Sequence, residues 1–347
     1  MIRLGIVGSN YGCAVLAPAF RLDARCKVVA LAGARADRAR EMAQQADIAT
    51  VCSDWRQLVA APDVDAVAVA TPPRVQPDIA VAALAAGKPV FAEKPMAGDL
   101  AAAKAMLKKV GSHPTMIDFG FTEIAAWRRT KAIIDEGRLG RLRHVAVTWH
   151  VENASTRLRA KNWKTDIATG GGALGNFVSH SLHYVEWLFG PLVGLSGRLA
   201  GLPDDPAFQT NVICAFAFAS GASGSYSMSC AAFGGSGHRL EIYGDDGALT
   251  LHNPTADYMR GFTLTSSDRK TNQPAPIALD DDPLDRQFPH DGRIAPVSRL
   301  AKRFLDAVEN GGGAKPDFAD GYRVQFLMDA VRRSHDGGRW IDVKETT

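Results

Sequence analysis

Short apolar runs alternate with stretches of helical length through the first 119 residues of this 347-residue chain. The apolar runs cover residues 2–8, 27–33, 64–71, 89–95 and 114–120, and the helical stretches cover residues 13–22, 35–46, 76–88 and 99–110. A strand that pairs in parallel with the next one needs a long crossover, usually a helix. The pattern therefore predicts a doubly wound parallel sheet, which binds nucleotides at the carboxyl ends of its strands.

The texture of the sequence changes after residue 119. A helix is expected at 125–140, β-rich runs with glycine turns fill the region from 143 to 267, and helices return at 297–311 and 320–334. A chain of this length exceeds one typical core. We therefore predict an α/β protein with a Rossmann-type domain at residues 1–119 and an α+β domain at residues 120–347, built on a large open mixed or antiparallel sheet.

Composition excludes several classes of protein. The net charge of +3 is too small to indicate a nucleic-acid partner, and no apolar run reaches the length of a membrane span. No export signal is visible at the start, and the five cysteines are widely spaced with no CxxC pair. We expect buried thiols in a cytoplasmic protein with neither a nucleic-acid nor a membrane partner.

The first turn departs from the GxGxxG dinucleotide fingerprint. Asn10 stands at the second glycine position, and Gly12 falls one place before the third. Asparagine tolerates a left-handed backbone better than most residues, and the helix start still offers N–H groups to a pyrophosphate. The turn is compatible with a cofactor cradle and with a plain strand–turn–helix junction.

The end of the second strand bears on the cofactor. An acidic residue there holds the ribose hydroxyls of NAD, but this chain has Ala32, Gly33, Ala34 and Arg35. An arginine without that acid suits the 2′-phosphate of NADP, because guanidinium pairs well with phosphate. The sequence favours NADP, with NAD as the alternative if Arg35 is a solvated residue at a helix start.

A glycine turn at residues 170–172 precedes Asn176, His180 and His183. Residues three and four apart share one face of a helix, so an amide and two imidazoles are expected to point the same way. An acid–base site, a metal site that includes Glu186 and an ordinary packed helix all fit this spacing. No HExxH motif is present and three-residue steps drift around a helix, so we expect no metal.

Four segments together resemble the glucose–fructose oxidoreductase / inositol dehydrogenase / MocA-type family of NAD(P)-dependent oxidoreductases. They are "GIVGSNYG", "ATPPRVQPDIAVAALAAGKPVFAEKPMA", "GGGALGNFVSHSLHYVEW" and "PDFADGYRVQFLMDAVRRSHDGGRW". The resemblance runs over nearly the whole chain, and "AGKPVFAEKP" is its most specific piece.

The resemblance implies a set of site residues. For the cofactor these are Gly8, Ser9, Asn10, Tyr11, Gly12, Arg35, Thr71, Pro72, Pro73, Gln76, Glu93 and Lys94. Lys94, His180 and Asn176 take the family's catalytic positions, and Lys94, Trp163, Asn176, His180 and His183 its substrate positions. The family has aspartate where this chain has Asn176, and often histidine where it has Gln76.

The implied reaction moves a hydride between a nicotinamide cofactor and a secondary alcohol or carbonyl of a carbohydrate-like molecule. Two alternatives stay open, a catalytically silent NAD(P)-binding sensor and a redox-neutral enzyme that recycles a bound NAD. The basic segment with Arg157, Arg159, Lys161 and Lys164 suits an anionic substrate or is a solvated loop. The resemblance further implies a homodimer or homotetramer that covers a broad apolar sheet face.

Overall fold

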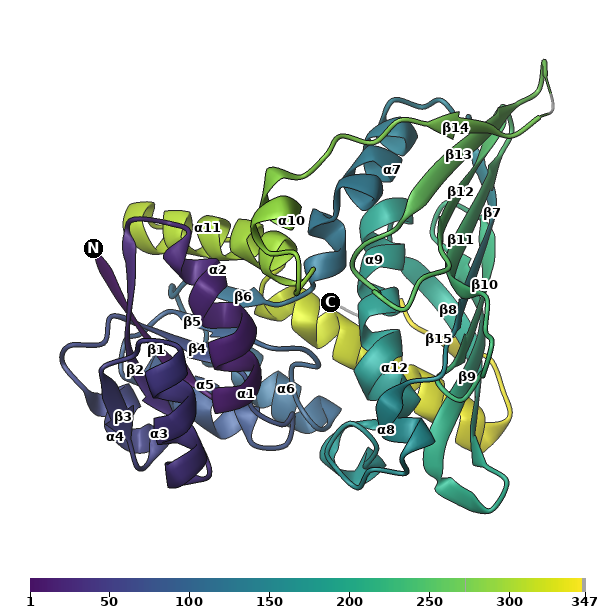
Figure 1. The fold of residues 1–347 in the computed structure, drawn as a ribbon. Coiled ribbons are helices and arrows are strands. Elements are labelled where there is room, and N and C mark those ends of the chain that lie inside the picture. Colours follow the sequence, from purple (N-terminus) through teal and green to yellow (C-terminus); the bar gives the residue numbers. More distant parts are fainter. Residues whose placement is uncertain (272, 345–347) are drawn as a thin grey trace. The chain divides into compact units, whose positions relative to one another are not determined.

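The computed structural model describes residues 1–271 and 273–344 and divides them into two units (Figure 1). The first unit combines residues 1–120 with residues 283–325, and the second combines residues 121–282 with the chain from 326 onward. The first segment of the first unit ends at residue 120, one residue after the expected domain boundary. Residues 283–325, which were expected in the second domain, group with the first unit.

The first unit contains a six-stranded parallel sheet in the order β3-β2-β1-β4-β5-β6. Its strands are β1 (Ile2–Val7), β2 (Cys26–Ala32), β3 (Thr50–Cys52), β4 (Ala66–Val69), β5 (Val90–Ala92) and β6 (Thr115–Ile117). This is the strand order of a dinucleotide-binding fold, and it confirms the predicted architecture. The central strands are buried along almost their whole length, as a sheet covered by helices on both faces requires.

Helices connect these strands. They are α1 (Ser9–Tyr11), a π-helical turn Gly12–Leu16 and α2 (Ala17–Arg21) in one continuous run, then α3 (Ala36–Gln45), α4 (Trp55–Ala60), α5 (Gln76–Ala85) and α6 (Leu100–Leu107). Aspartates start two of them, because the side chains of Asp54 and Asp99 accept hydrogen bonds from first-turn N–H groups. The short β3 and α4 were not predicted from the sequence.

The returning segment adds α10 (Pro283–Gln287), α11 (Ile294–Asn310) and the start of α12 (Phe318–Gly337) to the first unit. The apolar face of α11 buries Phe304 against Phe20 and Phe91, with ring centroids 6.2 and 5.9 Å apart. Phe20 and Phe91 lie 5.3 Å from each other in the same edge-to-face style. This aromatic core explains why the segment belongs to the N-terminal unit rather than to the second one.

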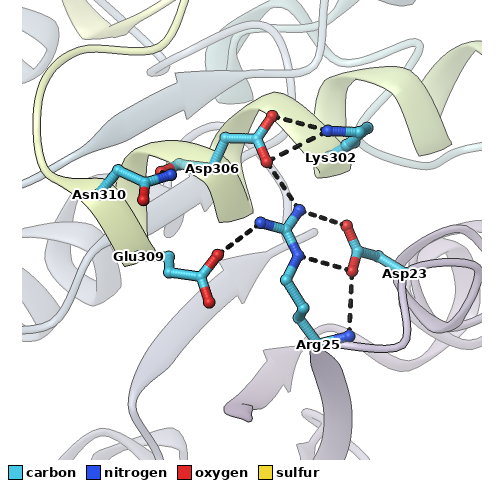
Figure 2. A network of polar contacts seen from close by, with 6 residues as sticks. All are labelled: Asp23, Arg25, Lys302, Asp306, Glu309 and Asn310. Carbon is cyan, nitrogen blue, oxygen red and sulfur yellow. Dashed lines mark hydrogen bonds and ion pairs between the residues drawn. The ribbon is translucent and has the colours of Figure 1, made fainter.

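Arg25, just before β2, also holds α11 in place through ion pairs (Figure 2). Its guanidinium donates to Asp23, to Asp306 at 2.7 Å and to Glu309 at 2.7 Å, and Lys302 donates to Asp306 at 2.9 Å. Single exposed ion pairs contribute little, but a network with one arginine at its centre fixes the register of α11 on the sheet.

The second unit is built on a nine-stranded sheet in the order β14-β13-β12-β11-β7-β10-β9-β8-β15. Its strands are β7 (Leu142–His150), β8 (Leu192–Leu202), β9 (Asp205–Phe218), β10 (Ser223–Ser229), β11 (Gly237–Gly244), β12 (Gly247–Asn253), β13 (Thr263–Asp268), β14 (Ala275–Ile277) and β15 (Ile341–Asp342). β7 and β10 pair in parallel and the other neighbours are antiparallel. The predicted mixed sheet is confirmed.

The helices of this unit are α7 (Ala125–Asp135), α8 (Ala154–Arg157), α9 (Ser179–Phe189) and the remainder of α12. The sheet residues that alternate with the buried ones are small or polar, as in the cross-strand row of Ala215, Ser225 and Ala146. Ile213 is 58% exposed on this face. The face is therefore not the broad apolar surface that motivated the expected oligomer.

In the part of the chain that the structure describes, no helix combines the length and apolar character needed to cross a membrane.

Candidate active site

The expected site residues fall into both units, and each set has its own geometry. The cofactor residues all belong to the first unit, where Gly8 follows β1, Arg35 follows β2, Thr71 follows β4 and Glu93 follows β5. Because these strands are parallel, all four positions lie at the carboxyl edge of one sheet, where open α/β sheets bind ligands.

Gly8 makes the first turn possible. Its φ is +115°, a conformation that favours glycine, and a Cβ at this position would overlap the carbonyl oxygen of Ala70. At Gly12 a Cβ would lie 2.6 Å from the Ile6 side chain, so this second glycine lets the helix pack on β1. At both glycines of the incomplete fingerprint, a larger side chain would therefore clash with neighbouring atoms.

Asn10 does not adopt the left-handed backbone that its place in the fingerprint suggested. It lies within α1 and is exposed, and among the described residues only Asp47 and Arg159 are non-glycine residues with positive φ. The turn needs just one left-handed residue, and Gly8 supplies it. No side chain caps α1 within the described chain. The first N–H groups of a helix have no intrahelical partner, so an uncapped helix start suits an anion.

Thr71 comes after β4, the strand that pairs with β1, and so lies near the turn at Gly8. Its Oγ1 is buried without a hydrogen-bond partner among the described residues, beside the Ala70 carbonyl that Gly8 approaches. The carbonyl oxygen of Pro72 accepts from Val75 N at 2.9 Å and starts α5. A glycine cradle, uncapped N–H groups and an unsatisfied buried hydroxyl fit a nicotinamide dinucleotide better than a plain junction.

Arg35 occupies the N-cap position of α3 and is exposed. Nearby arginines are neutralised, since Arg38 pairs with Glu41 and Arg40 pairs with Asp37. Within the described residues Arg35 itself forms no ion pair, so its guanidinium is open to solvent and to a ligand.

Gln76 was expected to contact the cofactor. Its side chain is fully buried, and its Nε2 donates to the main-chain oxygens of Glu93, Pro95 at 3.3 Å and Met96 at 3.1 Å. The amide thus supports the Glu-Lys-Pro turn from within the protein. Its Oε1 is buried without a hydrogen-bond partner among the described residues, and the expected contact with a cofactor stays a prediction.

Glu93 and Lys94 sit on that turn, which contains a cis peptide between Lys94 and Pro95. The backbone N of Lys94 donates to Glu93 Oε2 at 3.0 Å. Asp118, just after β6, accepts a hydrogen bond from the Tyr11 hydroxyl at 2.9 Å and is hydrogen-bonded to Glu93. Tyr11 therefore reaches the turn through its side chain, and its expected contact with the cofactor stays a prediction.

Asp118 was missed by the sequence analysis. It is 3% exposed, and burial raises its pKa well above the usual range, with the Glu93 carboxylate adding to the shift and Tyr11 and Lys94 opposing it. The available signal was a lone carboxylate at the carboxyl end of a predicted parallel strand, the edge where this fold does its chemistry.

The second glycine turn, in the other unit, is filled by protein. Gly170 and Gly172 have φ of +90° and +72°, and a Cβ at Gly171 would overlap the carbonyl oxygen of Trp163. The N–H groups of the turn are used: Gly171 N donates to Asp166 O and Gly172 N to Lys164 O, both at 3.0 Å. The expected substrate residue Trp163 thus packs its backbone on this turn, with its side chain half-buried.

A π-helical turn, Leu174–Val178, separates the glycines from α9. Asn176 therefore lies on a π turn and His180 on an α-helix, whereas a single α-helix was expected. The three polar residues Asn176, His180 and His183 are each half-buried. Isolated π turns are frequent at functional sites because they re-aim the residues that they carry.

Aromatic rings back His180. Phe121 meets its imidazole edge-on at a centroid distance of 4.9 Å, and Phe121 in turn contacts His238 at 5.5 Å. His238 is stacked on Trp149 at 4.3 Å and bonds to the Tyr184 hydroxyl at 2.9 Å. Burial lowers the pKa of His238 to about 3, so it stays neutral. This packed layer fixes the orientation of His180.

Glu186 is used structurally, since its carboxylate accepts a hydrogen bond from Leu192 N at 2.8 Å. The described residues contain no group of three or more histidines, cysteines and acids suited to a metal ion.

The basic segment presents fewer free charges than its sequence suggests. Arg159 pairs with both oxygens of Asp204, at 2.8 and 2.9 Å, and Lys164 lies 6.0 Å from the Trp163 ring. In the described chain Arg157, Lys161 and Lys164 form no ion pair and are exposed. The anionic substrate therefore stays a prediction.

Comparison with known families gives two matches. Residues 2–121 match the model "Oxidoreductase family, NAD-binding Rossmann fold", and residues 127–250 match the GFO/IDH/MocA C-terminal domain. The chain belongs to the GFO/IDH/MocA oxidoreductase family. Its NAD-binding Rossmann domain and its carbohydrate-oxidoreductase character follow from this membership and from the relatives.

Relatives of this GFO/IDH/MocA protein are similar along most of its length. An uncharacterised oxidoreductase of Synechocystis sp. is 29% identical and covers 99% of this chain and 96% of its own. Levoglucosan dehydrogenase of Pseudarthrobacter phenanthrenivorans is 26% identical, covering 91% and 89%. Inositol 2-dehydrogenase of Rhizobium meliloti is 26% identical, covering 99% of both chains.

Solved structures show the same fold. A levoglucosan dehydrogenase in complex with NADH and levoglucosan superposes with a TM-score of 0.87 at 24% identity, covering 99% of this chain and 100% of the other. An aldose–aldose oxidoreductase from Caulobacter crescentus gives a TM-score of 0.83 at 20% identity, covering 98% and 99%.

Proposed function

We propose that this chain is an NADP(H)-dependent dehydrogenase that interconverts a secondary alcohol and a carbonyl on a polyol or sugar. The observation that carries the proposal is Lys94, held beside the half-buried Glu93 and the buried Asp118 at the strand edge that also bears the glycine cradle of Gly8. Relatives named for levoglucosan and inositol support an uncharged ring polyol as the substrate class.

Oxidation of an alcohol removes a hydride from carbon and a proton from oxygen. The nicotinamide supplies or accepts the hydride when it is bound. Lys94 donates a hydrogen bond to the substrate oxygen and stabilises the negative charge that develops there. From the family resemblance we assign the proton-accepting role to His180, since imidazole exchanges protons near neutral pH. Asn176 hydrogen-bonds without carrying charge, so it orients rather than titrates.

Lys94→Met tests this assignment, because it keeps the length of the side chain and removes its charge. We expect kcat on the best ring polyol to fall by about 10²–10⁴-fold. Cofactor affinity, measured by fluorescence titration, should stay within about threefold. Unchanged turnover in this variant would refute the role of Lys94, and parallel loss of cofactor binding would move Lys94 from chemistry to binding.

The preference for NADP(H) rests on Arg35, which is exposed at the end of β2 where no carboxylate stands. We expect NADPH to bind more tightly than NADH. Arg35→Ala should weaken NADPH by about tenfold and leave NADH unchanged, since one charge-assisted contact to phosphate is lost. Arg38→Ala is the matched control, because Arg38 already pairs with Glu41. Tighter NADH in the unaltered protein would refute the NADP(H) part alone.

We further propose a homo-oligomer that forms through the outer face of the nine-stranded sheet. Exposed Ile213 beside the small residues Ala215 and Ser225 supports a flat, close contact. Light scattering should give a multiple of the chain mass, and Ile213→Asp should reduce it. A cytoplasmic location also stays a prediction.

A further inference from the structure

Asp118 is a buried acid that the proposed mechanism does not use. Its side chain is 3% exposed, directly after β6. The Tyr11 hydroxyl donates to its Oδ2 at 2.9 Å, and its carboxyl group is hydrogen-bonded to that of Glu93. Tyr11 comes from the helix after the glycine cradle and Glu93 from the turn that carries Lys94, so Asp118 joins the two features of the cofactor edge.

Two carboxyl groups can hydrogen-bond only if a proton lies between them. Two ionised carboxylates in contact, one of them buried, would repel each other strongly, so the pair retains one proton. Asp118 is the more buried member and receives the Tyr11 hydrogen bond at Oδ2. We therefore assign the shared proton to Asp118, the more buried of the two side chains.

We propose that Asp118 acts as a positioning residue for Lys94: as a neutral acid locked between Tyr11 and Glu93, it leaves a single negative charge beside the lysine and fixes the turn that bears it. This inference rests on the proposed function for the part played by Lys94. The state of Asp118 itself does not depend on that function.

The chain of contacts is continuous. Tyr11 donates to Asp118, Asp118 donates to Glu93, and the backbone N of Lys94 donates to Glu93 Oε2 at 3.0 Å. The charged groups around Asp118 are Glu93 and Lys94, with Tyr11 as the further titratable group. Movement of the Tyr11 helix would therefore be felt at the lysine turn.

The Tyr11 ring is itself held by the returning segment. The Arg293 guanidinium lies 5.4 Å from its centroid, and Asp291 pairs with Arg293 at 2.6 Å. The ring is thus fixed on one side by a cation and at its hydroxyl by Asp118, so its direction is set before any ligand arrives.

Asp118→Asn separates a neutral acid from an ionised one. An amide keeps one donor for Glu93 and one acceptor for Tyr11, so it mimics the protonated acid and no other form. We expect kcat and the pH profile of kcat/KM to stay within about threefold of the unaltered enzyme. Asp118→Leu should lower kcat by about 10²-fold with little change in cofactor affinity, because it removes both bonds.

Tyr11→Phe should give a smaller loss of about fivefold, since Asp118 keeps its bond to Glu93. Asp65→Asn serves as the control, because Asp65 is another partly buried acid of the same unit, paired with Arg3 just before β4 and so at the opposite edge of the parallel sheet. If Asp118→Asn loses as much activity as Asp118→Leu, the carboxylate is needed ionised and the proposal fails. If Asp118→Leu keeps full activity, Asp118 positions nothing.

Stability against pH tests the protonated state without activity. The unfolded chain ionises Asp118 above about pH 4, whereas the folded chain holds the proton to higher pH, so folding takes up a proton and stability falls as pH rises through that window. The Asp118→Asn variant has no acidic proton at this position, so its stability does not fall with pH for this reason. Its melting temperature should exceed that of the unaltered protein near pH 7.5, and the gain should vanish toward pH 4; a gain that persists unchanged at pH 4 would refute the shared proton.

Infrared difference spectra provide the last check. The C=O stretch of a protonated carboxylic acid, sensitive to D2O, should be present in the unaltered protein at neutral pH and absent in Asp118→Asn. A protein that shows this band but turns over no polyol would refute the proposed function and leave the shared proton intact. A protein that turns over polyols without the band would refute the shared proton and leave the proposed function intact.

Discussion

Two glycine turns, each followed by a π-helical turn, occur in this molecule and do opposite things. The turn at Gly8 leaves the first N–H groups of its helix without a side-chain cap. In the turn at residues 170–172, the backbone N–H groups donate hydrogen bonds to the carbonyls of Lys164, Asp166 and Ile167. In the first turn, Gly8 leaves the helix start open to a ligand. In the second turn, Gly171 allows the loop that contains Trp163 to pack closely against the backbone. A run of glycines alone does not say which of the two is present.

Among changes that test the contrast between the two turns, the largest expected effect comes from Gly8→Ala. The added Cβ meets the Ala70 carbonyl, and the positive φ adds strain of about 1–2 kcal/mol for any other L residue. We expect a total cost of about 3 kcal/mol or more at this turn, which lowers cofactor affinity by about 100-fold. Fluorescence titration with NADPH and NADH measures it. Gly87→Ala, with φ of +76° but open space around it, controls for strain alone.

Gly171→Ala is the counterpart in the second turn. Its Cβ would meet the Trp163 carbonyl, so the loop before the turn must move. We expect kcat/KM to fall about tenfold through displaced substrate-side groups, while cofactor affinity stays unchanged. If this variant loses cofactor affinity as Gly8→Ala does, the contrast between the two turns is wrong.

Gln209→Leu should have a smaller effect. Gln209 Oε1 accepts from Leu174 N at 2.9 Å and so closes the second turn. Loss of one such bond should lower the free energy of unfolding by about 1 kcal/mol. Gln209→Glu keeps an acceptor and should retain most of the stability. Urea denaturation of both variants makes the comparison, and equal loss in both would show that the acceptor is unimportant.

Arg159→Gly should have the smallest effect. The substitution removes an exposed ion pair with Asp204, which contributes little to stability, and relieves the left-handed φ of +48° at this residue. The midpoint of urea denaturation should therefore change little. A large rise in KM for a charged sugar, without a rise for a neutral one, would instead show that the basic segment binds anions.

The sequence was most informative where periodicity and steric need coincide. The alternation of strands and helices, the glycine turn at Gly8 and the place of Lys94 after β5 all follow from local patterns. The burial of Gln76 and Asp118 could not be predicted, because it depends on segments that are remote in the sequence. Asn10 was misjudged because the turn needs one left-handed residue, and nothing local says which.

The grouping of residues 283–325 with the first unit could not be predicted for a different reason. The pattern of α11 shows an apolar face but not what the face covers. Its partners, Phe20 and Phe91, lie more than 200 residues earlier in the chain. The contacts of Arg25 with Asp306 and Glu309 are equally remote.

That return has a consequence for the order in which the protein is made. A ribosome delivers the six strands first, but the helix that covers Phe20 and Phe91 emerges only near the end of synthesis. Until then the nascent sheet exposes an aromatic patch that no early segment shields. The first unit therefore matures after the second unit's sheet has been translated, and a truncated chain ending at residue 120 would leave the ribosome with its own core unfinished.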